Sequence, residues 1–304
     1  MSYNVSGLTT SVQENKDVIL REIVLGGEGG FTVEKLSKQL GVKTSERLHP
    51  MNVSTTLQEA TGCGFSADGS TVISERLINT AQAKVNDEWC EEDMLGKFAE
   101  YTVDIQAGKE KMPFEAEIMG QVVRNINKEV EKQIWLGDKS NTGRTDLIDG
   151  FVTIALGADS ASTITGQTAS GASAYQAVKD TLALIPEEIL DDAVIFVSPA
   201  IFRAYIQDLV AANLYHYDPA DGASEEFFIP GSNVKVRKTY GLKGSNYIYA
   251  STYDNMVYAA DLLNAKEELK VWFSDDNDVT RLKVRFNFGV QTLFPDAVVL
   301  VEKQ

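Results

Sequence analysis

The chain has 304 residues, 43% of them hydrophobic and 24% charged, which is long enough for one large folded domain or two of ordinary size. Its 28 basic and 44 acidic side chains leave a net charge of −16, which argues against a protein that grips nucleic acid mainly through phosphate contacts. No run approaches the roughly 20 apolar residues that span a bilayer, so no membrane partner is expected.

Cysteine and histidine are scarce. The cysteines are Cys63 and Cys90, and two reduced thiols in a cytosolic chain are favoured over one disulfide. The histidines are His49 and His216. Because histidine supplies much of the metal and acid–base chemistry near neutral pH, this composition lowers the expectation of an enzyme.

The first fifty residues are predicted to form an arm, a segment of short elements without a core of its own. Residues 11–25 and 32–40 predict two short helices, separated by a glycine-rich run at 26–30. Both helices are short and weakly apolar, so they are marginal alone and need another surface to lie against.

An extended segment follows. Residues 51–86 are rich in β-branched and polar side chains, and glycines with an aspartate make a turn cluster at 61–70. Both faces are too polar to be buried, so the pattern predicts a long hairpin that projects from the body.

The clearest predicted helix covers residues 115–136 and is about 33 Å long. It follows an acidic stretch at 87–93 and a shorter predicted helix at 94–101, where a solvated helix start is favoured over a metal site. An apolar residue recurs at every fourth position of the long helix, so the stripe winds and its two ends face different surfaces. These residues are Ile118, Val122, Ile126, Val130 and Ile134.

The second half mixes helices and strands. Residues 138–171 predict a loop with one short strand at 149–154. A helix at 172–185, a buried strand at 193–197 and a helix starting at Ser198 and Pro199 follow. The alternation of apolar and polar residues that is typical of a strand is strongest at 281–290. The other predicted strands are 234–237, 247–249, 256–259 and 297–301. The chain is therefore predicted to be α+β, without internal repeats.

The sequence contains no complete catalytic or ligand-binding motif, so no catalytic, cofactor-binding or metal-binding residue is predicted. The glycines at 26–30 lack the dinucleotide-binding spacing. Residues 138–149 partly match a calcium loop, but a surface turn is favoured. His216 lies between Tyr215 and Tyr217, where an aromatic cluster packed at an interface is favoured over a ligand or catalytic role.

The order of these segments resembles the major capsid proteins of tailed bacteriophages, whose fold is shared with encapsulin shells. The resemblance lies in element order and in three short signatures. They are the helix ending at Trp135-Leu136-Gly137-Asp138, the strand entering Val197-Ser198-Pro199-Ala200, and the final pair from Val284-Arg285-Phe286-Asn287-Phe288-Gly289-Val290 to Pro295-Asp296-Ala297-Val298.

The resemblance implies a domain plan. Residues 1–50 are the N-terminal arm, 51–90 the extended loop, 91–191 the peripheral domain with its spine helix at 115–136, 192–265 the axial domain, and 266–304 the return to the peripheral domain. No long coiled-coil scaffolding segment precedes the arm, which implies a separate scaffold protein or none.

The resemblance also implies a structural protein and no enzyme or cofactor. Copies would form the hexamers and pentamers of an icosahedral shell around double-stranded DNA, bound without sequence specificity, in a virion assembled in the host bacterial cytoplasm. Portal, scaffold or decoration proteins are the other expected partners. The residues expected at the assembly interface are Val53, Leu57, Phe65, Ile73, Leu77, Tyr215, His216 and Tyr217.

Three alternatives remain open. The first is an encapsulin-type compartment that carries a cargo enzyme. The second is a carboxylate-based hydrolase, since 44 acidic residues can always supply a pair. The third is a tail-tube or other virion protein that assembles as rings.

Overall fold

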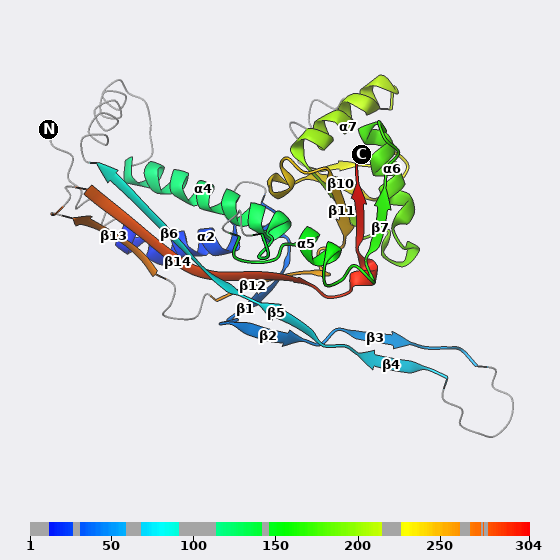
Figure 1. Ribbon diagram of the computed structural model, residues 1–304, viewed down its shortest axis with the longest axis horizontal. Helices are drawn as coiled ribbons and strands as arrows, with labels where there is room; N and C mark the ends of the chain where they lie inside the picture. Colours follow the sequence, from blue (N-terminus) through cyan, green and yellow to red (C-terminus); the bar gives the residue numbers. More distant parts are fainter. Residues whose placement is uncertain are drawn as a thin grey trace.

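The computed structural model describes residues 12–26, 31–58, 68–90, 114–141, 146–214, 226–261, 268–274, 276 and 279–304. These residues form an elongated molecule with two β-sheets, and a narrow ribbon of paired strands extends from it (Figure 1). Helices and sheets are mixed along the chain, so the predicted α+β class is confirmed.

One sheet has five strands and forms the long part of the body. Its central strand, β14 (Val279–Thr292), pairs with β6 (Ala81–Cys90) along one edge. Along the other edge it pairs with β13 (Glu268–Ser274) and then β12 (Met256–Ala260), and β1 (Ser37–Leu40) completes the sheet beside β12. Alternate residues in the first half of β14 are buried, as the alternation at 281–290 predicted.

Two helices cover the buried face of this sheet. α4 (Phe114–Leu136) crosses it, and α2 (Lys16–Leu25) lies beside α4 (Figure 1). The winding apolar stripe of α4 is buried at Ile126, Val130 and Ile134. The next residue, Trp135, is fully buried at the end of α4, where its ring meets aromatic side chains from α5 (Phe151–Leu156) and the second sheet. The two ends of α4 therefore pack against different surfaces, as predicted.

The second sheet has six strands. Their order is β7 (Ile164–Gln167), β15 (Val299–Glu302), β11 (Tyr247–Ser251), β8 (Val194–Val197), β10 (Lys235–Lys238) and β9 (Glu226–Phe228). α6 (Ala174–Leu184) and α7 (Pro199–Ala211) pack on it through a separate apolar core. The Ser198 hydroxyl caps α7 by accepting from the Ile201 amide, so the predicted start of this helix is confirmed.

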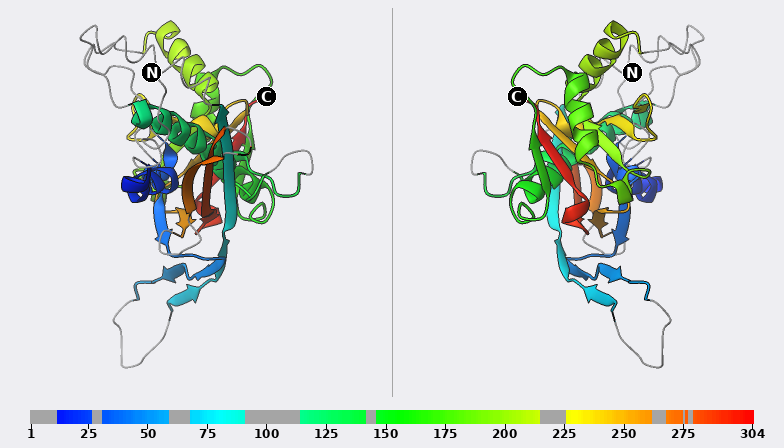
Figure 2. Two further views of the ribbon diagram at one scale, coloured as in Figure 1. Left: turned by 90° about the vertical axis from the view of Figure 1, so that its left-hand side faces the viewer. Right: turned by 90° about the vertical axis from the view of Figure 1, so that its right-hand side faces the viewer.

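Four short strands form the ribbon. β2 (Ser45–Leu48) pairs with β5 (Arg76–Asn79), and β3 (Met51–Ser54) pairs with β4 (Ser70–Ile73) further out. Figure 2 shows the ribbon standing clear of the body in two further directions. The predicted projecting hairpin is thus present, but its bounds differ. It begins at Ser45 and ends at Asn79, because residues 81–90 instead find a partner along β14.

Two predicted elements are wrong. Residues 32–40, predicted as a helix, form the 3₁₀ turn η1 (Thr32–Glu34) and strand β1, because residues 37–40 pair in parallel with β12. Residues 149–154, predicted as a strand, begin the helix α5 (Phe151–Leu156). An apolar run of this length does not distinguish a buried strand from a short buried helix. The other 3₁₀ turns are η2 (Glu187–Ile189), η4 (Tyr240–Leu242) and η5 (Pro295–Ala297).

The described part of the arm packs on its own chain. Leu20, Ile23 and Val24 of α2 are buried in the core that α4 shares with the five-stranded sheet, and Tyr258 of β12 donates a hydrogen bond to the Val24 carbonyl at 2.8 Å. The surface that this segment needs is therefore α4 and the sheet below it, and no neighbouring molecule is required to order residues 12–25.

The sheets do not follow the predicted domain boundaries. β7 and α6 lie before residue 192, and β15 lies after residue 265, yet all three belong with the six-stranded sheet. β12 lies inside the predicted axial range of 192–265 but pairs in the five-stranded sheet. These pairings join strands far apart in sequence, which local patterns do not show. The helix predicted at 94–101 lies outside the described residues.

Candidate assembly surface

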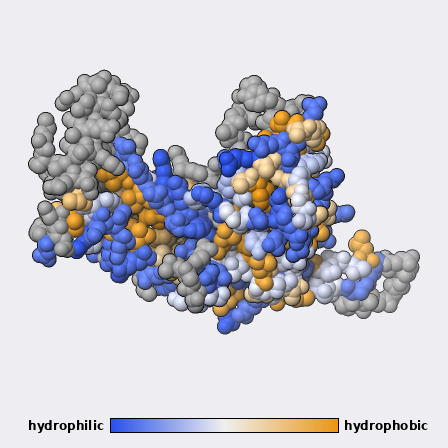
Figure 3. Space-filling view, turned by 45° about the horizontal axis from the view of Figure 1, so that its top comes forward, coloured by the Kyte–Doolittle hydropathy of each residue, from blue (hydrophilic) through white to orange (hydrophobic). Residues whose placement is uncertain are grey.

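The ribbon presents apolar side chains to solvent. In the register of β3 and β4, Met51 lies opposite Ile73, and Val53 lies opposite Thr71. Directly opposed residues share a face, so Met51, Val53 and Ile73 form one apolar row, in which each residue is 52% to 66% exposed. Val72 lies on the opposite face and is also exposed. Apolar groups appear at the surface of the ribbon in the space-filling view (Figure 3).

The ribbon is held firmly where it leaves the body. The Arg76 guanidinium pairs through both terminal nitrogens with the buried Asp159 carboxylate, one bond being 2.8 Å long, and its Nε donates to the Thr292 carbonyl at 3.1 Å. Such a bidentate pair fixes orientation as well as distance. Ile78 is fully buried beside β12. The ribbon is therefore anchored at its base.

A close backbone approach allows the ribbon to pass over β14. A Cβ atom at Gly289 would lie 2.2 Å from the Asn79 carbonyl oxygen, which no real side chain can tolerate. Only glycine at position 289 leaves room for the chain to turn from β5 into β6 at this point.

The predicted interface residues fall into two groups. Val53, Leu57, Ile73 and Leu77 are all exposed on the ribbon, and Leu57 is completely so. The remaining four lie outside the described residues: Phe65, Tyr215, His216 and Tyr217. Met51 and Val72 were not predicted at the interface, although Met51 lies two positions before Val53 in a strand and therefore shares its face. Whether these side chains meet a neighbouring copy stays a prediction.

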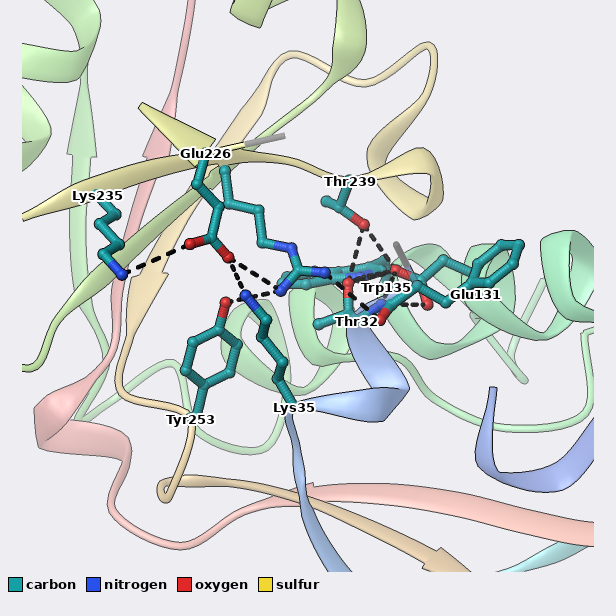
Figure 4. Close-up of polar contacts among 10 residues, drawn as sticks. Thr32, Lys35, Glu131, Trp135, Glu226, Lys235, Thr239 and Tyr253 are labelled. Atoms are coloured by element: carbon teal, nitrogen blue, oxygen red, sulfur yellow. Dashed lines mark hydrogen bonds and ion pairs between the residues drawn. The ribbon is translucent and has the colours of Figure 1, made fainter. Parts of the chain in front are cut away.

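A buried carboxylate joins three parts of the chain. Glu131 of α4 is 1% exposed, and it accepts hydrogen bonds from the Thr32 amide at 3.2 Å and the Thr239 hydroxyl at 2.7 Å (Figure 4). The Thr32 hydroxyl and the Trp135 indole also donate to it. Because Thr32 comes from the arm and Thr239 follows β10, Glu131 fixes both to the long helix.

A cluster of charges lies beside this junction. Lys35, Lys235 and Arg237 all pair with the Glu226 carboxylate, Arg237 at 3.3 Å and Lys235 at 3.6 Å (Figure 4). Arg237 is buried and also donates to the Tyr253 hydroxyl at 2.9 Å. Burial alone raises the pKa of Glu226, but the hydrogen bond and charge of Lys35 and the two other cations outweigh it and hold this pKa below its ordinary value.

No group of three or more metal-ligating side chains gathers anywhere in the described residues. Around 138–149, the Asp146 carboxylate accepts from the Asp138 amide at 3.1 Å, and Asp149 accepts from the Lys139 amide at 2.9 Å. These carboxylates therefore satisfy backbone donors of a turn, which is the interpretation that the sequence favoured. None of the helices described here has the length and apolarity to cross a bilayer.

No family model matches the sequence, and no curated protein matches it. Solved structures do resemble the fold. A chain of the satellite phage P4 procapsid is similar with a TM-score of 0.62 at 12% identity, covering 100% of this chain and 92% of that one. The capsid of the native GTA particle is similar with a TM-score of 0.58 at 13% identity, with 89% and 88% covered.

A structure of Microbacterium phage Oxtober96 is also similar, with a TM-score of 0.57 at 10% identity and coverage of 91% of this chain and 92% of that one. In each case the likeness extends over 88% or more of both chains. The chain thus has the α+β fold of phage capsid proteins, as the resemblance in its sequence implied.

Proposed function

We propose that this chain is the major capsid protein of a tailed bacteriophage, and that its copies form the hexamers and pentamers of an icosahedral shell around double-stranded DNA. The observation that carries this proposal is the ribbon. It is anchored at its base, projects from the body, and exposes apolar side chains and two unpaired strand edges. Such a surface is unfavourable in water and is satisfied by pairing with another chain.

The ribbon is suited to meet another copy of this chain. Residues 51–58 and 69–74 contain no charged side chain, although 24% of the whole chain is charged. Two molecules that each carry −16 repel one another, so a neutral element can approach a second copy at a smaller electrostatic cost than the rest of the surface. Val53, Leu57, Ile73 and Leu77 are the side chains proposed to make this contact.

An apolar groove on the body is the proposed acceptor. It lies between α4 and β6, has a volume of about 500 Å³, and is open to solvent. Ile126 and Val130 of α4 form one wall, while Ala83, Val85 and Phe286 come from the sheet. The uncharged strands β3 and β4 would bury their own exposed apolar side chains in this groove. Each contact is modest, but several per subunit compound into a stable shell.

The remaining expectations belong to the same proposal. We keep the domain plan in outline: an N-terminal arm, an extended loop formed by the ribbon at residues 45–79, a peripheral domain around the five-stranded sheet and an axial domain around the six-stranded sheet. Portal, scaffold or decoration proteins are the proposed further partners, the virion is the proposed location, and assembly takes place in the host bacterial cytoplasm. The enclosed DNA is held without sequence specificity.

The test is negative-stain electron microscopy of the overexpressed protein. Closed icosahedral particles, or hexamers and pentamers that convert into them, are the expected result. A monomer at all concentrations and salts would overturn the proposal. Open rings or tubes would instead indicate a tail-tube protein, and closed shells that carry a protein cargo would indicate an encapsulin-type compartment.

A further inference from the structure

Nine neighbouring positions on the five-stranded sheet form a regular grid. Across β6, β14 and β13, Glu88 lies beside Arg281 and Trp272, and Asn86 lies beside Lys283 and Lys270. In the third row, Lys84 lies beside Arg285 and position 268. Residues paired in this way point to the same face of a sheet. We name this surface the cationic face, after Lys84, Lys270, Arg281, Lys283 and Arg285.

The cationic face is turned away from the helices. The residues between its members on β14, Leu282 and Val284, are buried with α2 and α4 on the other side of the sheet. Lys84 and Lys270 are exposed, and Arg281, Lys283 and Arg285 are half-buried. Four of these five cations, all but Lys270, line a hollow of about 620 Å³, and Asp87 and Glu88 are the acidic residues of its lining.

Its charge is opposite to that of the molecule. The chain carries 28 basic and 44 acidic residues, yet five of the nine grid positions are basic and two, Glu88 and Glu268, are acidic. Glu88 pairs with Arg281 at 3.6 Å. Evenly mixed surface charge would give fewer cations than anions here, so basic residues are concentrated on this face.

Two of the rows place like charges directly opposite one another. Lys270 lies opposite Lys283, and Lys84 lies opposite Arg285. Directly opposed side chains have Cβ atoms about 5 Å apart. A ligand that carries several negative charges at short spacing therefore meets cations of both rows together.

We propose that the cationic face binds the phosphodiester backbone of duplex DNA, and that this face of the sheet therefore lines the inside of the shell. The inference rests on the proposed function, which brings DNA to the protein. Successive cations along β14 are about 6.7 Å apart. Duplex DNA presents one charge for about every 1.7 Å of its axis, so its backbone meets these cations in any register.

The observations favour DNA over an acidic patch on a second copy of this chain. A protein partner must place its carboxylates at particular positions over two adjacent rows. A phosphate backbone supplies that spacing everywhere along its length. Binding by each subunit is weak because few phosphates are neutralised, and it is strengthened in a shell, where many faces contact one DNA molecule.

The test is fluorescence anisotropy of the unassembled subunit with a labelled duplex of about 20 base pairs, titrated at salt concentrations from about 0.02 M upward. The variant is Lys84→Gln with Lys270→Gln, because both side chains are exposed and each lies opposite a like charge. We expect binding of the wild-type protein at low salt, about a tenfold loss of affinity in the variant, and a salt slope smaller by about 1 to 2. Thermal stability of the variant should be unchanged, because both side chains are exposed.

The matched control is Lys128→Gln with Lys179→Gln, which removes the same charge from exposed sites on α4 and α6. Its affinity should stay close to that of the wild-type protein. No binding by the wild-type protein at low salt, or an equal loss in the control, would overturn the inference. Shells that form normally while binding is independent of the cationic face would refute this inference alone. Face-dependent binding by a protein that never assembles would refute the proposed function instead.

Discussion

At the scale of single residues, two carboxylates attach the arm to the rest of the molecule. Glu131 binds the backbone and side chain of Thr32, and Glu226 pairs with Lys35 three residues further along the chain. Nothing in the sequence indicates these contacts, because the partners are 99 and 191 positions apart. Either residue alone looks like one more member of an acidic surface. Only its position in the fold distinguishes it.

The pairing of Glu226 leads to a prediction about pH. Because the pKa of Glu226 is lower in the folded protein, its stabilising contribution is complete above the unfolded value of about 4.3 and is lost as the pH falls through the folded value. Glu226→Gln should therefore lower the free energy of unfolding by about 2 kcal/mol at neutral pH. Urea unfolding of both proteins should show this difference shrink in acid.

The control for this measurement is Glu129→Gln, which removes an exposed carboxylate 3.9 Å from Lys132 on α4. A surface pair of this kind contributes about 0 to 1 kcal/mol, so the variant should follow the wild-type protein at every pH. A Glu226→Gln effect of equal size in acid and at neutral pH would show that the charge of Glu226 is not what stabilises the fold.

At the scale of elements, the ribbon has two faces of different character. The face with Met51, Val53 and Ile73 is the more apolar one, while Asn52 and Ser54 lie on the other face with Val72 as its single apolar residue. The sequence was sufficient to predict that this segment projects, because β-branched and polar residues alternate without enough apolar surface for a core. The bounds were not predictable, since the end of the ribbon depends on where β6 begins to pair with β14.

Val53→Asp should abolish assembly without unfolding the subunit. The side chain is half exposed in the isolated chain, so a carboxylate there costs the monomer little. Burying the same carboxylate against a neighbouring copy costs about 3 kcal/mol at each contact, or roughly a hundredfold in association constant. Light scattering measures assembly, and thermal unfolding checks the fold.

Asn52→Asp is the matched control, because it adds the same charge one position away on the opposite face of β3. Its assembly should be close to that of the wild-type protein. If both variants assemble normally, the ribbon is not part of the contact between copies. If only Asn52→Asp fails, the contact uses the polar face instead.

At the scale of the whole molecule, the net charge of −16 opposes association. Each copy repels the next through its overall field, while the proposed contacts between copies are short-range and apolar. On the cationic face, which belongs to the described surface, basic residues outnumber acidic ones, the reverse of the chain as a whole. A shell built in this way forms when screening weakens the long-range repulsion and leaves the short-range contacts unchanged.

Assembly of the purified subunit should therefore be faster at higher ionic strength. Raising the salt from about 0.1 M to about 1 M shortens the Debye length from about 10 Å to about 3 Å. Time-resolved light scattering should show a shorter lag and a higher rate of assembly. Assembly that slows as salt rises would contradict the account, because it would mean that attraction between charges holds the copies together.

Much of the architecture was present in local patterns. The long helix at 115–136, the cap at Ser198 and the alternation of apolar and polar residues at 281–290 all follow from spacing and composition within a few neighbouring residues. These features depend on interactions between near neighbours along the chain, which a sequence displays directly. The excess of 44 acidic over 28 basic residues is likewise read directly from the sequence.

Only the tertiary structure decided which distant segments meet. It placed the described arm on α4, turned residues 37–40 into a strand beside β12, and aligned β6, β14 and β13 so that their cations share one face. Each outcome depends on pairing between residues that are far apart in sequence. Backbone hydrogen bonds and burial are satisfied by the complete fold. The secondary-structure preference of a segment is therefore overridden where pairing with a distant segment is more stable.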